Sequence, residues 1–106
     1  MLLNVLSRGV VLTDSMRAAV QRKLDFALDR FGDQLERVEV TIEDLNGPRG
    51  GVDKKVRLLM SGPVRRGVVI EERGDNVMAV LSSAADRASQ VLGRIMERRN
   101  RLAHRS

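Results

Sequence analysis

Five arginines near the C-terminal end of the chain are the residues whose type and spacing most directly suggest chemistry. We call them the arginine rail: Arg87, Arg94, Arg98, Arg101 and Arg105. On an α-helix of about 3.6 residues per turn, these spacings keep all five side chains within a sector of roughly 60°. Like charges this close repel each other by roughly 0.2–0.5 kcal/mol per pair, so an isolated domain gains nothing from the cluster. The rail therefore predicts a binding site for a polyanion.

The alternative for the arginine rail is an ordinary solvated helix face followed by a frayed tail, and the pattern alone does not decide between the two. The distribution of charge adds weight to binding. Residues 94–106 hold five arginines and one glutamate, and the whole chain has a formal charge of +5. A local basic excess of this kind usually indicates nucleic acid or an anionic membrane surface as the partner.

A helix that could hold the rail is predicted from Asp75, the candidate N-cap, towards Arg105. Its apolar residues recur every three or four positions, as in an amphipathic helix with one face towards a core. They are Val77, Val80, Leu81, Ala84, Ala88, Val91, Leu92, Ile95 and Leu102. An end near Asn100 is the alternative, and it would leave Arg101 in the tail.

An earlier helix is predicted from Thr13 or Asp14, either of which can cap it, to about Phe31, with Gly32 as the stop. Its apolar stripe consists of Met16, Val20, Leu24, Ala27, Leu28 and Phe31. Four segments alternate apolar and polar residues as strands do: 2–7, 38–43, 53–60 and 68–72. Between the second and third strands, residues 46–51 are rich in glycine and proline and predict a loop.

The order of elements predicts a two-layer α+β fold, β-α-β-β-β-α, within one domain spanning residues 1–106. The long first connection favours parallel pairing of the first two strands, and the later short links favour antiparallel pairing, which gives a four-stranded mixed sheet. Each helix has one apolar stripe, so both should pack on one face of the sheet. The other face should be polar, and it would carry Asn4, Glu39, Thr41, Glu43, Lys55 and Arg57.

Residues suited to catalysis or metal binding are sparse. The absence of cysteine excludes disulfides, thiolate metal sites and thiol nucleophiles. His104 is the sole histidine and has no evident partner, while Glu71 and Glu72 are adjacent in a strand and must point to opposite faces. The loop at 46–51 lacks the Gly-Lys-Ser/Thr ending of a phosphate-binding loop. We expect no enzyme activity, no cofactor, no metal site and no small-molecule substrate.

Several stretches of the chain are similar to a known family. They are Ser7-Arg8-Gly9-Val10-Val11-Leu12-Thr13, Lys23-Leu24, the segment from Asn46 to Lys54, and Asp86-Arg87 with Gln90 and Arg94. With these residues the chain resembles the ribosome hibernation-promoting factors, also called ribosome-associated inhibitors or sigma-factor modulation proteins. The resemblance covers nearly the whole sequence, and the end at Ser106 is that of a short form.

The resemblance implies a stress-response protein that binds the RNA of the small ribosomal subunit in the channel for messenger and transfer RNA, and so inhibits translation. A cytoplasmic location is expected from the absence of cysteine and of a signal peptide. Only Phe26 and Phe31 are aromatic, which disfavours a reader that stacks bases across a sheet and leaves cations on phosphates as the mechanism. The predicted RNA-binding residues are Arg8, Lys23, Arg30, Arg49, Lys54, Arg87, Arg94, Arg98 and Arg101.

Each of the isolated cations has a simpler alternative. Lys23 and Arg30 lie seven residues apart on one helix flank and could pair with nearby aspartates, Arg8 could bond locally in its turn, and Arg49 and Lys54 could belong to a surface hairpin. Two other functions stay open: a protein-interaction module that regulates a transcription factor, and a generic binder of structured RNA. A homodimer through exposed sheet edges is possible. We expect no membrane association, since the N-terminus lacks a signal peptide and no long apolar stretch occurs.

Overall fold

The computed structural model describes residues 2–45, 53–62 and 67–103. Its elements are β1 (Leu2–Arg8), α1 (Asp14–Leu28), the 3₁₀-helix η1 (Asp29–Gln34), β2 (Arg37–Asp44), β3 (Lys54–Ser61), β4 (Val68–Gly74) and α2 (Val77–Ala103). The predicted order of strands and helices is confirmed, and each strand differs from its predicted bounds by one or two residues. The predicted loop at 46–51 lies outside the described residues.

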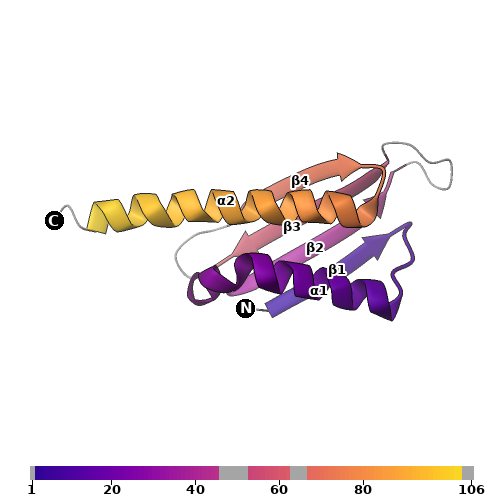
Figure 1. Ribbon diagram of the computed structural model, residues 1–106, viewed down its shortest axis with the longest axis horizontal. Helices are drawn as coiled ribbons and strands as arrows, with labels where there is room; N and C mark the ends of the chain where they lie inside the picture. Colours follow the sequence, from indigo (N-terminus) through magenta and orange to yellow (C-terminus); the bar gives the residue numbers. More distant parts are fainter. Residues whose placement is uncertain (1, 46–52, 63–66, 104–106) are drawn as a thin grey trace.

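The four strands form one mixed sheet in the order β1-β2-β3-β4, as Figure 1 shows. β1 pairs parallel to β2, with Val5 opposite Val40, and the other two pairings are antiparallel. The parallel pair follows from the helical crossover between β1 and β2, because only a long connection can return the chain in the same direction. The predicted topology is therefore confirmed.

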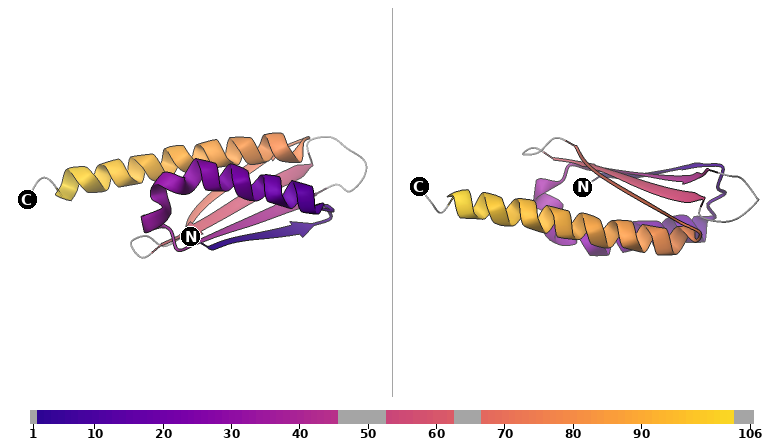
Figure 2. Two further views of the ribbon diagram at one scale, coloured as in Figure 1. Left: turned by 60° about the horizontal axis from the view of Figure 1, so that its bottom comes forward. Right: turned by 90° about the horizontal axis from the view of Figure 1, so that it is seen from above.

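Both helices cover one face of the sheet, which gives the two layers visible in Figure 2. Apolar side chains from α1, α2 and the inner sheet face meet between these layers and lose almost all contact with solvent. The fully buried ones include Val20, Leu24, Leu28, Val38, Val40, Ile42, Val56, Leu58, Leu81, Ala84, Ala85 and Ala88. The alternation predicted for the strands places the strand residues of this set inward, and the predicted polar residues of β2 and β3 lie on the outer face.

Helix α1 begins at the predicted cap and ends earlier than predicted. The Thr13 hydroxyl accepts a hydrogen bond of 3.1 Å from the backbone N–H of Met16, as an N-cap should. The regular helix stops at Leu28, and the chain tightens into η1, which carries the buried Phe31. A helix end commonly tightens in this way to satisfy its last carbonyl groups. The apolar spacing continued through η1 and so concealed the change of helix type.

Helix α2 begins one residue later than predicted, because its cap is one residue further along the chain. The side-chain oxygen of Asn76, not that of Asp75, accepts a hydrogen bond of 3.0 Å from the N–H of Ala79. This is the bond from an N-cap side chain to the third residue of a helix that starts at Val77. The assignment of Asp75 as the cap was therefore wrong.

The C-terminal part of α2 extends past the sheet, as Figure 1 shows. Its 27 residues span about 40 Å at 1.5 Å per residue, whereas a strand of seven or eight residues spans about 25 Å. Leu102 was predicted to face the core but is 61% exposed. That prediction was wrong because the helix has no sheet beneath it there. We call the part of α2 from Arg94 onward the overhang.

Candidate nucleic-acid interface

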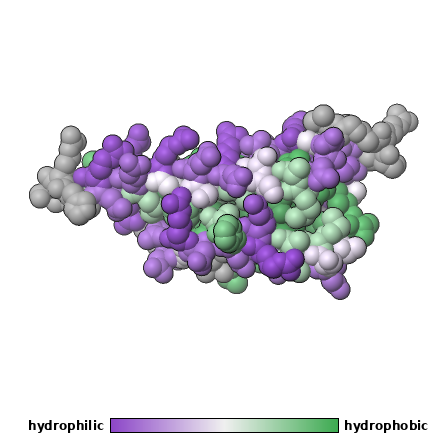
Figure 3. All heavy atoms as spheres, in the orientation of Figure 1, coloured by the Kyte–Doolittle hydropathy of each residue, from purple (hydrophilic) through white to green (hydrophobic). Residues whose placement is uncertain are grey.

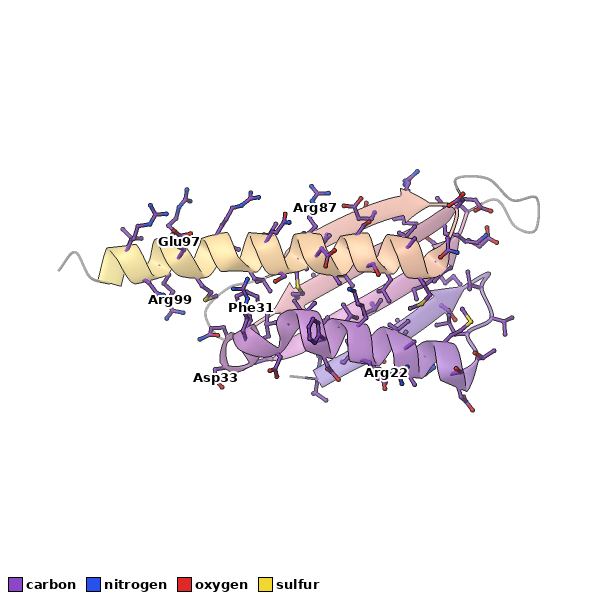
Figure 4. The ribbon with its side chains drawn as sticks, in the orientation of Figure 1. Arg22, Phe31, Asp33, Arg87, Glu97 and Arg99 are labelled. Atoms are coloured by element: carbon purple, nitrogen blue, oxygen red, sulfur yellow. The ribbon has the colours of Figure 1, made fainter. Side chains whose placement is uncertain are left out.

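The arginine rail lies on the flank of α2 that faces away from α1. Arg87 marks this flank in Figure 4, and its guanidinium lies 3.2 Å from the Glu72 carboxylate on β4. Arg94, Arg98 and Arg101 share its helical phase and continue the rail along the overhang. Hydrophilic side chains accordingly line the outer edge of α2 in Figure 3.

Three arginines of the rail lie on the overhang, Arg94, Arg98 and Arg101. All three are exposed, and within the described residues none of them forms an ion pair. Helix α2 runs to Ala103, so Arg101 belongs to the helix and not to a frayed tail. Glu97 is the one carboxylate in the described part of the overhang. The result is a rigid row of free guanidinium groups, which can form bidentate hydrogen bonds to phosphate oxygens.

Arg30 and Lys23 lie on the other side of α2, in the gap between the two helices. The Arg30 guanidinium donates hydrogen bonds of 3.4 and 3.3 Å to the backbone oxygen and the hydroxyl of Ser89, and it lies 4.4 Å from the centroid of the Phe31 ring. No aspartate pairs with Arg30 or Lys23 among the described residues. Arg30 thus links η1, at the end of α1, to α2.

The predicted basic residues of the two helices therefore do not merge into one continuous surface. The rail follows the β4 side of α2, while Lys23 and Arg30 line a shallow hollow on the α1 side. The exposed surface of α2 between them carries uncharged and acidic residues, among them Ser83, Asp86 and Gln90. A nucleic acid would meet two basic groups separated by the width of one helix.

Two of the cations predicted outside the helices, Arg8 and Lys54, form ion pairs with carboxylates of the same domain. Arg8 is exposed, and its guanidinium lies 4.0 Å from Glu43 on the outer sheet face. The Lys54 ammonium lies 3.2 Å from Asp44 and 3.0 Å from Asp53, and its side chain is 20% exposed. Arg49 and Arg105 lie outside the described residues.

The hydrogen bond to Asp53 is the main cause that raises the pKa of Lys54 above its ordinary value, and Asp44 adds to it. Partial burial acts in the opposite direction but is the smaller effect. The positive charge of Lys54 is therefore largely compensated by Asp44 and Asp53 within the domain. Less of this charge is available to a partner than the sequence suggested.

Other kinds of site find little support in the described residues. They contain no group of three or more histidine, cysteine or acidic side chains that could hold a metal ion. Among the same residues, no helix is both long enough and apolar enough to cross a membrane.

The family model for "Sigma 54 modulation protein / S30EA ribosomal protein" matches residues 3–100 of this chain. The chain belongs to this family. The resemblance seen in the sequence is thereby confirmed.

Two solved structures have a similar fold. The N-terminal domain of Protein Y from Thermus thermophilus is 23% identical, with a TM-score of 0.72 over 90% of this chain and 99% of that one. A ribosomal subunit interface protein from Coxiella burnetii is 13% identical, with a TM-score of 0.73 over 92% of this chain and 99% of that one. No curated protein sequence matches.

Two features of this S30EA domain were missed in the sequence. Phe26 is 86% exposed on α1, next to the hollow that contains Lys23 and Arg30. Its position out of phase with Leu24 and Leu28 could have revealed this. The second feature is a groove of about 590 Å³ beneath the overhang, lined in part by Val91, Ile95 and Leu102. It could not be found without knowing where the sheet ends.

Proposed function

We propose that this protein, acting as one domain over residues 1–106, binds the ribosomal RNA of the small subunit in the channel for messenger and transfer RNA and so inhibits translation under stress. The observation that carries the proposal is the row of unpaired arginines on the overhang. Family membership supports it, as does the likeness to a protein described as a ribosomal subunit interface protein.

The geometry of α2 suits this role in two ways. The overhang stands clear of the sheet, so Arg94, Arg98 and Arg101 can enter a recess in a folded RNA without a clash with the rest of the domain. A single rigid helix also holds the three guanidinium groups at fixed spacings, which reduces the entropy lost on binding. Contacts of this kind read the shape and phosphates of the RNA, so binding should depend strongly on salt and little on base sequence.

The test reverses the charge of two rail arginines and compares the effect on binding with that of an equal charge reversal elsewhere on the domain. The double variant Arg94→Glu and Arg98→Glu lowers the net charge from +5 to +1, and so does the control Arg37→Glu and Arg73→Glu on exposed positions of the outer sheet face. Arg87 is left intact because it pairs with Glu72. Co-sedimentation with small subunits should be lost in the rail variant and largely kept in the control.

Equal loss in the two double variants would mean that total charge, not the rail, governs binding, and would contradict the proposal. Circular dichroism of each variant ensures that a loss of binding is not a loss of folding. Naked duplex RNA is added as a competitor to test for a generic RNA binder. If the protein were one, duplex RNA would compete as well as intact subunits do.

A second candidate function rests on the groove beneath the overhang. Val91, Ile95 and Leu102 give part of it an apolar lining that a phosphate chain does not need but a protein helix could cover. The rail arginines Arg94, Arg98 and Arg101 line the same groove. This favours the alternative of a protein-interaction module that regulates a transcription factor. A purified complex that survives nuclease and high salt would support that function, since an RNA–phosphate interface should not survive both.

A further inference from the structure

The hollow between α1 and α2 combines groups that the rail lacks. It has a volume of about 340 Å³, and its lining includes Lys23, Phe26, Arg30, Asp86 and Ser89. This volume is at the small end of the range for ligand pockets, which suits one aromatic heterocycle and not a larger ligand. The hollow opens beside α1, on the opposite side of α2 from the rail.

Phe26 is the unusual member of this set. The chain has two phenylalanines and no tyrosine or tryptophan, and Phe26 leaves 86% of its surface exposed while Phe31 is buried. A single exposed apolar side chain is common and needs no explanation by itself. Here, however, the ring borders a hollow that is also lined by two cations, two carboxylates and a hydroxyl group.

One wall of the hollow is held in place before any ligand arrives. The Arg30 guanidinium is fixed by its hydrogen bonds to Ser89 and by its position over the ring of Phe31. Gly93 allows this close approach, because a Cβ atom there would lie only 3.2 Å from a guanidinium nitrogen of Arg30. A preorganised wall of this kind lowers the entropy cost of binding.

The charges decide which chemical group fits. A phosphate inside the hollow would be repelled by the Asp29 and Asp86 carboxylates, so the anion should stay outside the hollow. A nucleobase is uncharged, offers an aromatic face to Phe26 and carries N–H donors that a carboxylate can accept. We propose that the hollow binds one unpaired nucleobase, stacked on Phe26, with Asp86 and Ser89 available to its polar edge. This inference rests on the proposed binding to ribosomal RNA.

The first test measures affinity for small ribosomal subunits across a salt series. Phe26→Ala should weaken binding by about tenfold or more, the range expected when one stacking partner is removed. The slope of log affinity against log salt should stay as in the wild type, because no phosphate contact is lost. Phe26→Tyr should restore binding, and Phe26→Leu should not, since leucine has no aromatic face.

The matched control removes an exposed apolar side chain far from the hollow. Val11 is 88% exposed, and Val11→Ala should leave affinity unchanged. A direct readout comes from Phe26→Trp, which gives a single fluorophore in a chain that has no tryptophan. Stacking on a base should quench its fluorescence when subunits are added, while the control Val11→Trp should respond little.

Three results would overturn the nucleobase site. They are wild-type affinity in Phe26→Ala, equal affinity in Phe26→Leu and Phe26→Tyr, and an unquenched Phe26→Trp that still binds subunits. Each of them leaves the proposed function intact, because the wild type would still bind. If the wild type fails to bind subunits even at low salt, the proposed function fails and the nucleobase site fails with it.

Discussion

At the scale of single residues, Lys54 shows how the fold changes the role of a cation. Asp53 is 1% exposed, and one of its carboxylate oxygens receives the Lys54 ammonium at 3.0 Å. A buried carboxylate left without a counter-charge is strongly destabilising. Lys54 therefore stabilises the start of β3 through its ion pair with Asp53.

The raised pKa of Lys54 predicts a loss of stability at alkaline pH. The folded state binds this proton more tightly than the unfolded state, so the stabilisation is complete below the ordinary value of 10.5 and disappears as pH rises through the raised value. The free energy of unfolding, measured with urea between pH 9 and 12, should therefore fall more in the wild type than in Lys54→Met. The chain has no tyrosine or cysteine to titrate in the same range. Parallel pH profiles would contradict the role of Lys54.

Gly62 is a residue whose type is dictated by a distant segment. A Cβ atom at this position would overlap the backbone carbonyl of Gln34 at the end of η1. Gly62→Ala should therefore lower the free energy of unfolding by about 1–3 kcal/mol, as overpacking usually does. Gly32→Ala is the matched control, because nothing lies within 4 Å of its new methyl group. Equal urea midpoints for the two variants would refute the steric explanation.

Single residues also mark the limit of what the sequence could predict. The cap at Thr13 was one of two candidates, because a helix start depends on residue type and local spacing. The roles of Arg30 and Gly62 depend on Ser89 and Gln34, which the fold brings to them from elsewhere in the chain. No local pattern contains such contacts.

At the scale of elements, the start of α2 has two neighbouring candidates for its N-cap, Asp75 and Asn76, which substitution can distinguish. Asn76→Ala should lower the free energy of unfolding by about 1 kcal/mol, because the N–H of Ala79 loses its acceptor. Asp75→Ala should change it by less than about 0.5 kcal/mol, as is usual for exposed positions. Thermal or urea unfolding of the two variants provides the comparison. A larger loss in Asp75→Ala would restore Asp75 as the cap.

The overhang shows why helix periodicity predicts burial only in part. The apolar spacing of α2 correctly identified the buried Leu81, Ala84 and Ala88, and it continued unchanged to Leu102. Spacing defines which face of a helix is apolar, but the length of the sheet determines how far that face is covered. The part left uncovered carries Arg94, Arg98 and Arg101, which is where we place the interface.

At the scale of the whole molecule, the topology was predictable and the arrangement of its charges was not. Alternation within strands, one apolar stripe per helix and the lengths of the connections together predict a single two-layer fold. The relation of the rail to Lys23 and Arg30 depends on the rotation of each helix about its axis when both are packed. The packed structure places α2 between the two basic groups, and this separates the proposed phosphate-binding edge from the proposed nucleobase site.

The most direct test of the account is the affinity of the purified protein for isolated small and large ribosomal subunits across a salt series. We predict binding to the small subunit, with a slope of log affinity against log salt of roughly −3, as expected for about four phosphate contacts. Binding that does not depend on salt, equal binding to the large subunit, or no binding by the folded protein at low salt would contradict the account.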